Sequence, residues 1–151
     1  MTLQVKLVVP EGEVWTGQAD RIVAKTLDGE IGILTGHTPV LGILSPGSVV
    51  RILPAEAAAG GWVQAAVGTG FLSVAADRVS VLARDAILGA DVDKATVRAE
   101  LQTAVGEAQS ASSGQGSSGQ GSSGQGSSGQ SAELARANYL RAQLRAAGEE
   151  V

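Results

Sequence analysis

Hydrophobic and polar positions divide the chain into three regions, and the first of them, residues 1–89, has the pattern of an all-β domain. Short apolar runs recur there at intervals of about 8 to 12 residues, a spacing typical of an antiparallel sandwich or barrel. In the last run, Val79, Val81 and Ala83 occupy alternate positions, and this imperfect period of two predicts one buried face. A sheet with a single covered face is usually antiparallel. The runs are LQVKLVV, DRIVAKT, EIGIL, VVRIL, WVQAAV, FLSVA and RVSVLAR.

Turn residues separate these runs. Glycine, proline and aspartate favour chain reversal because they adopt or preset the backbone angles that tight turns need. The segment from Gly68 to Gly70 stands between two strand-like runs and predicts a hairpin turn. No helical crossover pattern interrupts residues 1–89. The predicted reversals are Pro10 to Gly12, Asp28 with Gly29, Pro46 with Gly47, Gly60 with Gly61, and Ala76 with Asp77.

The spacing of apolar residues changes to that of an α-helix over residues 91–109. Asp91 is the predicted N-cap, because its carboxylate can accept hydrogen bonds from the first free amides of a helix. Gly106 weakens this helix by about 1 kcal/mol relative to alanine. The apolar stripe of the helix consists of Val97, Leu101, Ala104 and Ala108.

A Ser/Gly/Gln repeat follows, with no apolar residue from Ser112 to Gln130. A segment of this composition cannot bury enough surface to offset its ordering entropy, so a flexible tether is predicted. A second helix is predicted to start at Ser131, as its N-cap, and to end at Gly148. Its narrow apolar stripe consists of Ala137, Leu140, Leu144 and Ala147.

The predicted fold class is therefore a mainly β N-terminal sandwich followed by a C-terminal α-helical hairpin or arm. The sandwich covers residues 1–89, the first helix 90–110, the linker 111–130 and the second helix 131–151. The facing stripes are rich in alanine, and a tether of about twenty residues raises the entropic cost of closing the hairpin. The second helix is therefore predicted to be the least stable part of the chain.

Charge and composition exclude several classes of function. The chain has 151 residues and a net charge of -4, whereas nucleic-acid-binding proteins usually carry an excess of Lys and Arg. It contains no cysteine, which excludes disulfides and thiolate metal sites. Its N-terminal residues lack a targeting pattern, and no apolar stretch approaches the roughly 20 residues that span a bilayer. We expect a protein of an interior compartment that binds no nucleic acid.

Residues with catalytic or metal-binding chemistry are few. His37 is the single histidine, and nothing in the spacing around it supports a catalytic relay with a serine or threonine. A metal site built from His37, Asp28 and Glu30 would have too few nitrogen or thiolate ligands for structural zinc. No Walker sequence occurs, and no GxGxxG occurs outside the Ser/Gly/Gln repeat, where no strand-like run precedes it. No catalytic residue and no metal site are predicted, and an interaction protein is favoured.

Two stretches carry a resemblance to a known family. Residues 28–47, DGEIGILTGHTPVLGILSPG, and 70–83, GFLSVAADRVSVLA, resemble the epsilon subunit of bacterial and chloroplast F-type ATP synthases. The resemblance covers Met1 to about Gln109, as an N-terminal β-sandwich and part of a helical pair, and it resumes at Ser131. It implies a non-catalytic subunit of the central stalk, which couples proton flow to ATP synthesis.

The resemblance also implies partners and a location. The sandwich would bind the gamma subunit and the rotor ring (c-ring), and the arm would reach the alpha and beta catalytic subunits. The protein would be peripheral, on the cytoplasmic face of a bacterial cell membrane or the stromal face of a thylakoid membrane. It would contact the membrane only through the complex.

Site residues follow from the same resemblance. Glu30, Gly36 and His37 match the family loop that faces the c-ring and are the expected ring contacts. Basic residues of the last helix would meet acidic residues of the catalytic subunits and restrain ATP hydrolysis. The positions that could do this are Arg136, Arg141 and Arg145.

Some relatives bind ATP through a motif (I/L)DxxRA at the start of the first helix. Val92 and Asp93 match its first two positions loosely, but Thr96 and Val97 stand where Arg and Ala belong. Arg98 restores the arginine two residues late, on a different face of the helix. No resident cofactor is therefore expected. The alternatives that remain open are a free-standing β-sandwich nucleotide-binding module with a helical lid, and an enzyme that uses His37.

Overall fold

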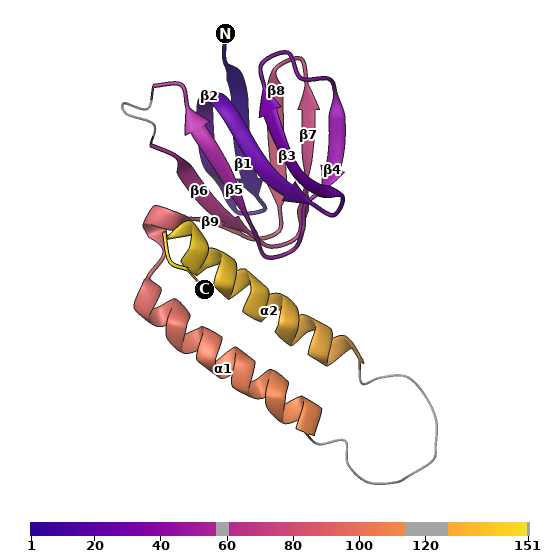
Figure 1. Cartoon of the computed structure of the whole chain (residues 1–151), viewed down its shortest axis with the longest axis vertical. Coiled ribbons are helices and arrows are strands. Elements are labelled where there is room, and N and C mark those ends of the chain that lie inside the picture. Colours follow the sequence, from indigo (N-terminus) through magenta and orange to yellow (C-terminus); the bar gives the residue numbers. More distant parts are fainter. Residues whose placement is uncertain (57–60, 114–126, 151) are drawn as a thin grey trace.

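The computed structural model describes residues 1–56, 61–113 and 127–150, and it consists of a β-sandwich with a pair of antiparallel helices below it (Figure 1). Nine strands form one continuous hydrogen-bonded sheet in the order β4-β7-β8-β1-β2-β5-β6-β9, and β3 pairs with β2. The strands are β1 (Leu3–Val9), β2 (Gly12–Thr26), β3 (Gly29–Leu34), β4 (Val40–Ile43), β5 (Ser48–Pro54), β6 (Val63–Val67), β7 (Gly70–Ala75), β8 (Arg78–Ala83) and β9 (Ala86–Leu88).

Strand β2 joins the two layers of the sandwich. Its first part pairs with β1 up to Ala19, and its second part pairs with β5 from Ala19 and with β3 from Arg21 onward. A register shift between Ala19 and Arg21 marks the change of partner, as expected of a bulge that bends a strand. The predicted sandwich is therefore confirmed, and one long strand belongs to both of its layers.

Two expectations about strand pairing are wrong. Strands β1 and β8 pair in parallel, with Val5 beside Val79, although an antiparallel sandwich or barrel was predicted. The segment from Gly68 to Gly70 is not a hairpin turn, because β6 pairs with β5 and β9 while β7 pairs with β4 and β8. It carries the chain from one layer to the other. Local turn chemistry does not distinguish a hairpin from such a corner.

The core of the sandwich confirms the alternation in β8. Val79, Val81 and Ala83 are buried in the main cluster together with inward residues of the other strands. The predicted reversal at Ala76 and Asp77 is also present, and both residues have left-handed φ angles, 49° and 59°. The predicted turn at Gly60 lies outside the described residues. Turns at Asp28 with Gly29 and at Pro46 with Gly47 are confirmed.

The first helix begins later than predicted. A short 3-10 helix, η2 (Gly89–Asp91), precedes α1 (Lys94–Ser113). Asp93 caps α1, since its Oδ1 accepts hydrogen bonds from the amides of Ala95 and Thr96 at 3.2 and 3.5 Å. The prediction of Asp91 as the cap is wrong, because Asp91 is the last residue of η2.

The second helix begins earlier than predicted. α2 spans Ser127–Ala146, so Ser131 lies inside it and is not its N-cap. Residues 111–113 and 127–130, which were assigned to the flexible linker, are helical. The rest of the predicted linker, 114–126, lies outside the described residues. The end of α2 agrees with the prediction, because Gly148 has φ +87° and the amide of Glu149 donates to the carbonyl of Leu144 at 2.9 Å.

The predicted stripes of the two helices face each other. Val97 and Ala104 of α1 pack against Ala137, Leu140 and Leu144 of α2 in one buried cluster. The pairing confirms the antiparallel hairpin. Figure 1 shows the two helices side by side along their lengths.

A second face of α2, which the sequence did not reveal, packs on the sandwich. Val49, Ala66 and Ile87 are neighbours across β5, β6 and β9 and form an outward apolar line, here called the covered row. Ala142 and Ala146 of α2 pack onto it, with Tyr139 beside them. The alanines permit close approach, and α2 is therefore fixed to both α1 and the sandwich.

Candidate functional site

The outward face of the other layer carries large apolar side chains with no helix of the described chain over them. Ile43, Phe71 and Leu82 are 61%, 46% and 41% exposed. The register places Ile43 beside Phe71, Phe71 beside Leu82, and Leu82 beside Val8. We call this line across β4, β7, β8 and β1 the open row: Val8, Leu82, Phe71 and Ile43.

The open row exists because these strands are apolar on both faces. Leu72 and Val81 point inward and are fully buried, while their neighbours Phe71 and Leu82 point outward. A hollow of about 550 Å³ lies at the row, lined by residues 8–10, 69–71 and 82–84. A contiguous exposed apolar surface of this kind marks a site of protein interaction. The signal in the sequence was Leu82, which makes the alternation of β8 imperfect.

The loop between β3 and β4 holds two of the predicted ring contacts. Gly36 has φ +80°, and its amide donates to Asp77 Oδ1 at 2.7 Å. The His37 amide donates to the carbonyl of Leu34 at 3.1 Å, and His37 Nδ1 lies 2.7 Å from the Thr38 carbonyl. This loop lies at the end of the sandwich that is remote from the helices (Figure 1).

Glu30 lies elsewhere. It stands at the start of β3, so the extended strand separates it from Leu34, where the loop with Gly36 begins, by about 13 Å at roughly 3.3 Å per residue. Glu30 Oε1 is 3.3 Å from Nη2 of Arg51 on β5. It also shares a pocket with Asn138 and Arg145 of α2. The structure thus places Glu30 beside the arm, and it does not bring Glu30 together with Gly36 and His37.

The three arginines of the predicted inhibitory surface have different surroundings. Arg136 Nη2 lies 3.9 Å from Glu100 Oε2 on α1, and Arg141 Nη1 donates to Asn138 Oδ1 at 3.3 Å. Arg145 lines the pocket between α2 and the sandwich. In the docked arm, Arg136 therefore lies beside α1, Arg141 bonds within α2, and Arg145 lines the pocket at the sandwich face.

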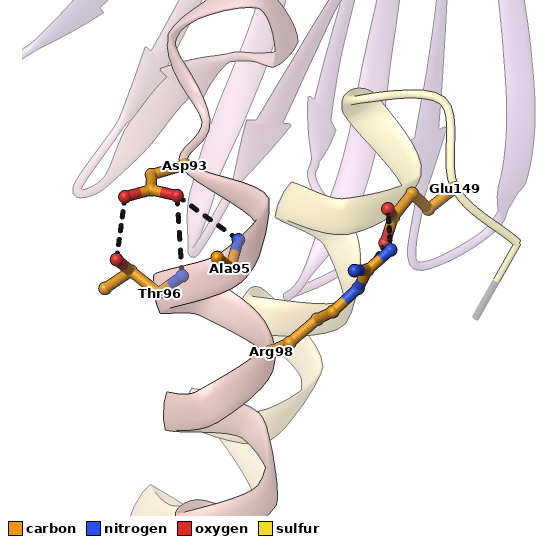
Figure 2. Close-up of polar contacts among 5 residues, drawn as sticks. All are labelled: Asp93, Ala95, Thr96, Arg98 and Glu149. Carbon is orange, nitrogen blue, oxygen red and sulfur yellow. Dashed lines mark hydrogen bonds and ion pairs between the residues drawn. The ribbon is translucent and has the colours of Figure 1, made fainter.

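The residues of the loosely matched ATP motif are engaged with other groups of the chain (Figure 2). Asp93 caps α1, and the Thr96 hydroxyl donates to Asp93 Oδ2 at 2.7 Å. These hydrogen bonds, that of the Thr96 hydroxyl above all, lower the pKa of Asp93. Arg98 points across the hairpin to the segment that follows α2, where its Nε donates to Glu149 Oε2 at 3.1 Å. Val92 is partly buried against the cluster between the helices.

Two kinds of feature are absent from residues 1–56, 61–113 and 127–150, a metal-binding cluster and a membrane-spanning helix. That part of the chain holds no group of three or more His, Asp or Glu side chains placed to hold a metal ion. None of its helices is long and apolar enough to cross a membrane.

Comparison with known proteins identifies relatives of the sandwich. Residues 2–89 match a family model described as ATP synthase, Delta/Epsilon chain, beta-sandwich domain. The ATP synthase epsilon chain of Thermobifida fusca is 52% identical over 107 residues, which cover 70% of this chain and 77% of that protein. The epsilon chain of Frankia casuarinae is 47% identical over 88 residues, 58% of this chain and 99% of that protein.

Solved structures share the fold. A chain in the cryo-EM structure of the Euglena gracilis mitochondrial ATP synthase, OSCP/F1/c-ring, aligns with a TM-score of 0.71 at 17% identity, covering 98% of this chain and 82% of that chain. One in the Tetrahymena thermophila mitochondrial ATP synthase, central stalk/c-ring, aligns with a TM-score of 0.54 at 20% identity, covering 97% and 96%. At these identities the likeness concerns the sandwich and helical pair alone.

Proposed function

The chain belongs to the family of ATP synthase delta and epsilon chains, and from this premise we propose that it is a non-catalytic rotor subunit of the central stalk. In this role it binds the gamma subunit and the c-ring and couples proton flow to ATP synthesis. It sits on the cytoplasmic or stromal face of the membrane and reaches the membrane only through the complex.

The observation that carries this proposal is the open row. Each layer of the sandwich has one outward apolar line, and α2 occupies the covered row. The open row has the same cross-strand construction, with the larger side chains Phe71 and Leu82. Burial of one such side chain contributes about 1.5–3 kcal/mol. We assign the open row to a helical surface of the gamma subunit.

The proposed contact with the c-ring is the β3–β4 loop. Gly36 and His37 lie there at the end of the sandwich that points away from the arm (Figure 1). Asp77 holds the loop in place through the amide of Gly36. Glu30 lies at the other end of β3, so the proposed ring contact is centred on Gly36 and His37.

The arm is proposed to restrain ATP hydrolysis when α2 leaves the covered row. Arg136, Arg141 and Arg145 would then meet carboxylates of the alpha and beta subunits, which suit the bidentate geometry of arginine. In the docked arm, Arg136 lies beside Glu100 and Arg141 beside Asn138. Release of α2 would make all three guanidinium groups available on one helix.

Addition of the protein to an ATP synthase core that lacks its epsilon subunit tests the proposal. We expect the wild-type chain to co-purify with gamma, to restore proton-coupled ATP synthesis and to change ATP hydrolysis. The double variant Phe71→Ser with Leu82→Ser should weaken gamma binding by at least about tenfold. Leu27→Ser is the matched control, because Leu27 is 63% exposed but lies outside the open row. Equal gamma binding by both variants would refute the assignment of the open row.

A further inference from the structure

Arg84 stands beside the open row, on the side that is nearer to the arm. It follows Ala83, the last residue of β8, and its amide donates to the Thr69 carbonyl at 2.8 Å. Because side chains alternate along an extended strand, Arg84 lies on the same outward face as Leu82 of the open row. The side chain of Arg84 is exposed.

The hollow of about 550 Å³ at the open row has one charged group in its lining. Among the described residues that line it, 8–10, 69–71 and 82–84, Arg84 alone carries a charge, and most of the others are apolar. An apolar hollow with a single guanidinium group beside it fits an apolar side chain that has an anionic neighbour.

Arg84 has no counter-charge in the part of the chain that the structure describes. None of the ion pairs between those residues includes it. Asp85 is the next residue, but its Oδ2 would lie 3.2 Å from a Cβ at Gly68, and it lines the hollow at α2 and not the one at the open row. Arginine is enriched in protein interfaces, and its planar fork binds carboxylates in a bidentate manner. The unpaired guanidinium group is therefore available to a carboxylate of a partner.

The two sides of the open row differ in charge. On the side away from the arm, the register places Ser73 beside Ser80, and Ser80 beside Lys6. The serines are uncharged, and Lys6 is paired with Glu13 at 3.6 Å. The row next to the open row on that side thus has no unpaired charge, whereas Arg84 borders the open row on the arm side.

We propose that the segment of gamma on the open row places an apolar side chain in the hollow and a carboxylate on Arg84. This inference rests on the proposed function, because it assigns gamma to the open row. Complementary charges at an interface fix its register and disfavour wrong partners. The pair with Arg84 sets the orientation of the gamma segment, with its acidic side toward the arm and its uncharged side toward Ser73 and Ser80.

Binding of the full chain to gamma, within an ATP synthase core that lacks its epsilon subunit, tests this contact at several salt concentrations. We expect Arg84→Gln to weaken binding about fivefold at low salt and to reduce the salt dependence, because screening acts on the same charge pair. Arg84→Glu should weaken binding further, since it brings like charges together. Arg84→Lys keeps the charge but loses the bidentate fork, so its affinity should lie between those of the wild type and Arg84→Gln.

Arg78→Gln is the matched control. Arg78 lies at the other end of β8 on the same face, about 20 Å from Arg84 at roughly 3.3 Å per residue. Equal weakening by Arg78→Gln and Arg84→Gln would overturn the inference, because it would indicate a general effect of net charge. Wild-type affinity in Arg84→Gln, with weakened binding in the double variant Phe71→Ser with Leu82→Ser, would overturn it while the proposed function stands. Wild-type affinity in that double variant would instead overturn the assignment of the open row to gamma.

A second measurement separates gamma binding from docking of the arm, because Arg84 also lines the hollow between the sandwich and α2, where Tyr139 lies. Amide exchange in α2 is measured for each variant of the free chain. We expect Arg84→Gln to bind gamma more weakly while α2 exchanges at the wild-type rate. If gamma binding falls only in those variants whose α2 exchanges faster, Arg84 acts through the arm and the inference is wrong.

Discussion

Asp77 and Gly36 are 41 positions apart in the sequence, and the amide of Gly36 donates a hydrogen bond to Asp77 Oδ1 at 2.7 Å. Two connections meet there, the β3–β4 loop and the β7–β8 turn. The turn is unusual because Ala76 and Asp77 both adopt left-handed φ angles without being glycine. Such backbone strain persists only where surrounding contacts hold it. The hydrogen bond to Gly36 is one of those contacts.

Loss of the Asp77 carboxylate should loosen the β3–β4 loop. In Asp77→Gly the positive φ remains favourable, so the variant isolates the side chain from the backbone. We expect amide exchange at Gly36 to rise about tenfold, the effect of removing a hydrogen bond to a charged group. Asp77→Asn keeps an acceptor oxygen and should retain most of the protection. Equal exchange rates in Asp77→Gly and wild type would show that the turn holds the loop by other means.

Close packing of α2 depends on the absence of a side chain at Gly89. A Cβ at this position would collide with the main chain of Ala146 at the end of α2. Gly89→Ala should therefore displace the end of α2 and raise its amide exchange, while the strands stay protected. Gly106→Ala is the matched control, because its Cβ would have no neighbour within 4 Å. That substitution should stabilise α1 by about 0.5–1 kcal/mol. Unchanged exchange in Gly89→Ala would contradict the predicted collision.

The ion pair between Arg98 and Glu149 should hold the end of the chain against the start of α1 (Figure 2). Its two side chains are 60% and 18% exposed, so the pair is screened on the arginine side. We expect Glu149→Gln to raise amide exchange after Leu144 and to reduce stability by about 1 kcal/mol or less. High salt should reproduce part of this effect in the wild-type chain. A double-mutant cycle with Arg98→Gln measures the coupling energy between Arg98 and Glu149. A coupling energy of zero would show that this ion pair does not hold the end of the chain.

Tyr139 should make the docking of α2 sensitive to high pH. Burial raises the pKa of Tyr139 to about 12, and the negative charge of Asp85 adds to the shift. The folded-state pKa exceeds the ordinary value of 10.0, so the folded protein favours the neutral phenol. The contribution of Tyr139 to folding stability is therefore complete below pH 10 and is lost as the pH rises to about 12. The chain has one tyrosine, so the ultraviolet absorbance of tyrosinate reports this group alone.

Two variants separate the causes of the raised pKa of Tyr139, which are burial and the charge of Asp85. Tyr139→Phe cannot ionise and should keep α2 docked across the same pH interval. Asp85→Asn should lower the pKa of Tyr139 toward its ordinary value, since it removes the negative charge. A wild-type titration with an unshifted midpoint would contradict burial of Tyr139 against the sandwich.

Periodicity and the glycine that ends the second helix predicted the local structure well, because they depend on neighbours along the chain, whereas both helix N-caps were misplaced. The alternation of Val79, Val81 and Ala83 identified the buried face of β8, and Gly148 identified the end of α2. The cap of α1 was misplaced because Asp91 and Asp93 both suit the role, and only the turn of η2 decides between them. The start of α2 was misplaced because Ser131 has cap chemistry but stands inside a longer helix.

The sequence by itself determined the β-rich region, the two helices with their facing stripes, and the family resemblance that the comparisons confirm. The tertiary structure alone decided that β1 pairs in parallel with β8, that α2 covers one outward row and leaves the other open, and that Glu30 lies beside Arg145 and far from His37. Periodicity records whether a side chain is buried, and it carries no information about which distant segment buries it. Those partners depend on contacts between residues far apart in the chain, which only the folded arrangement of the strands and helices brings together.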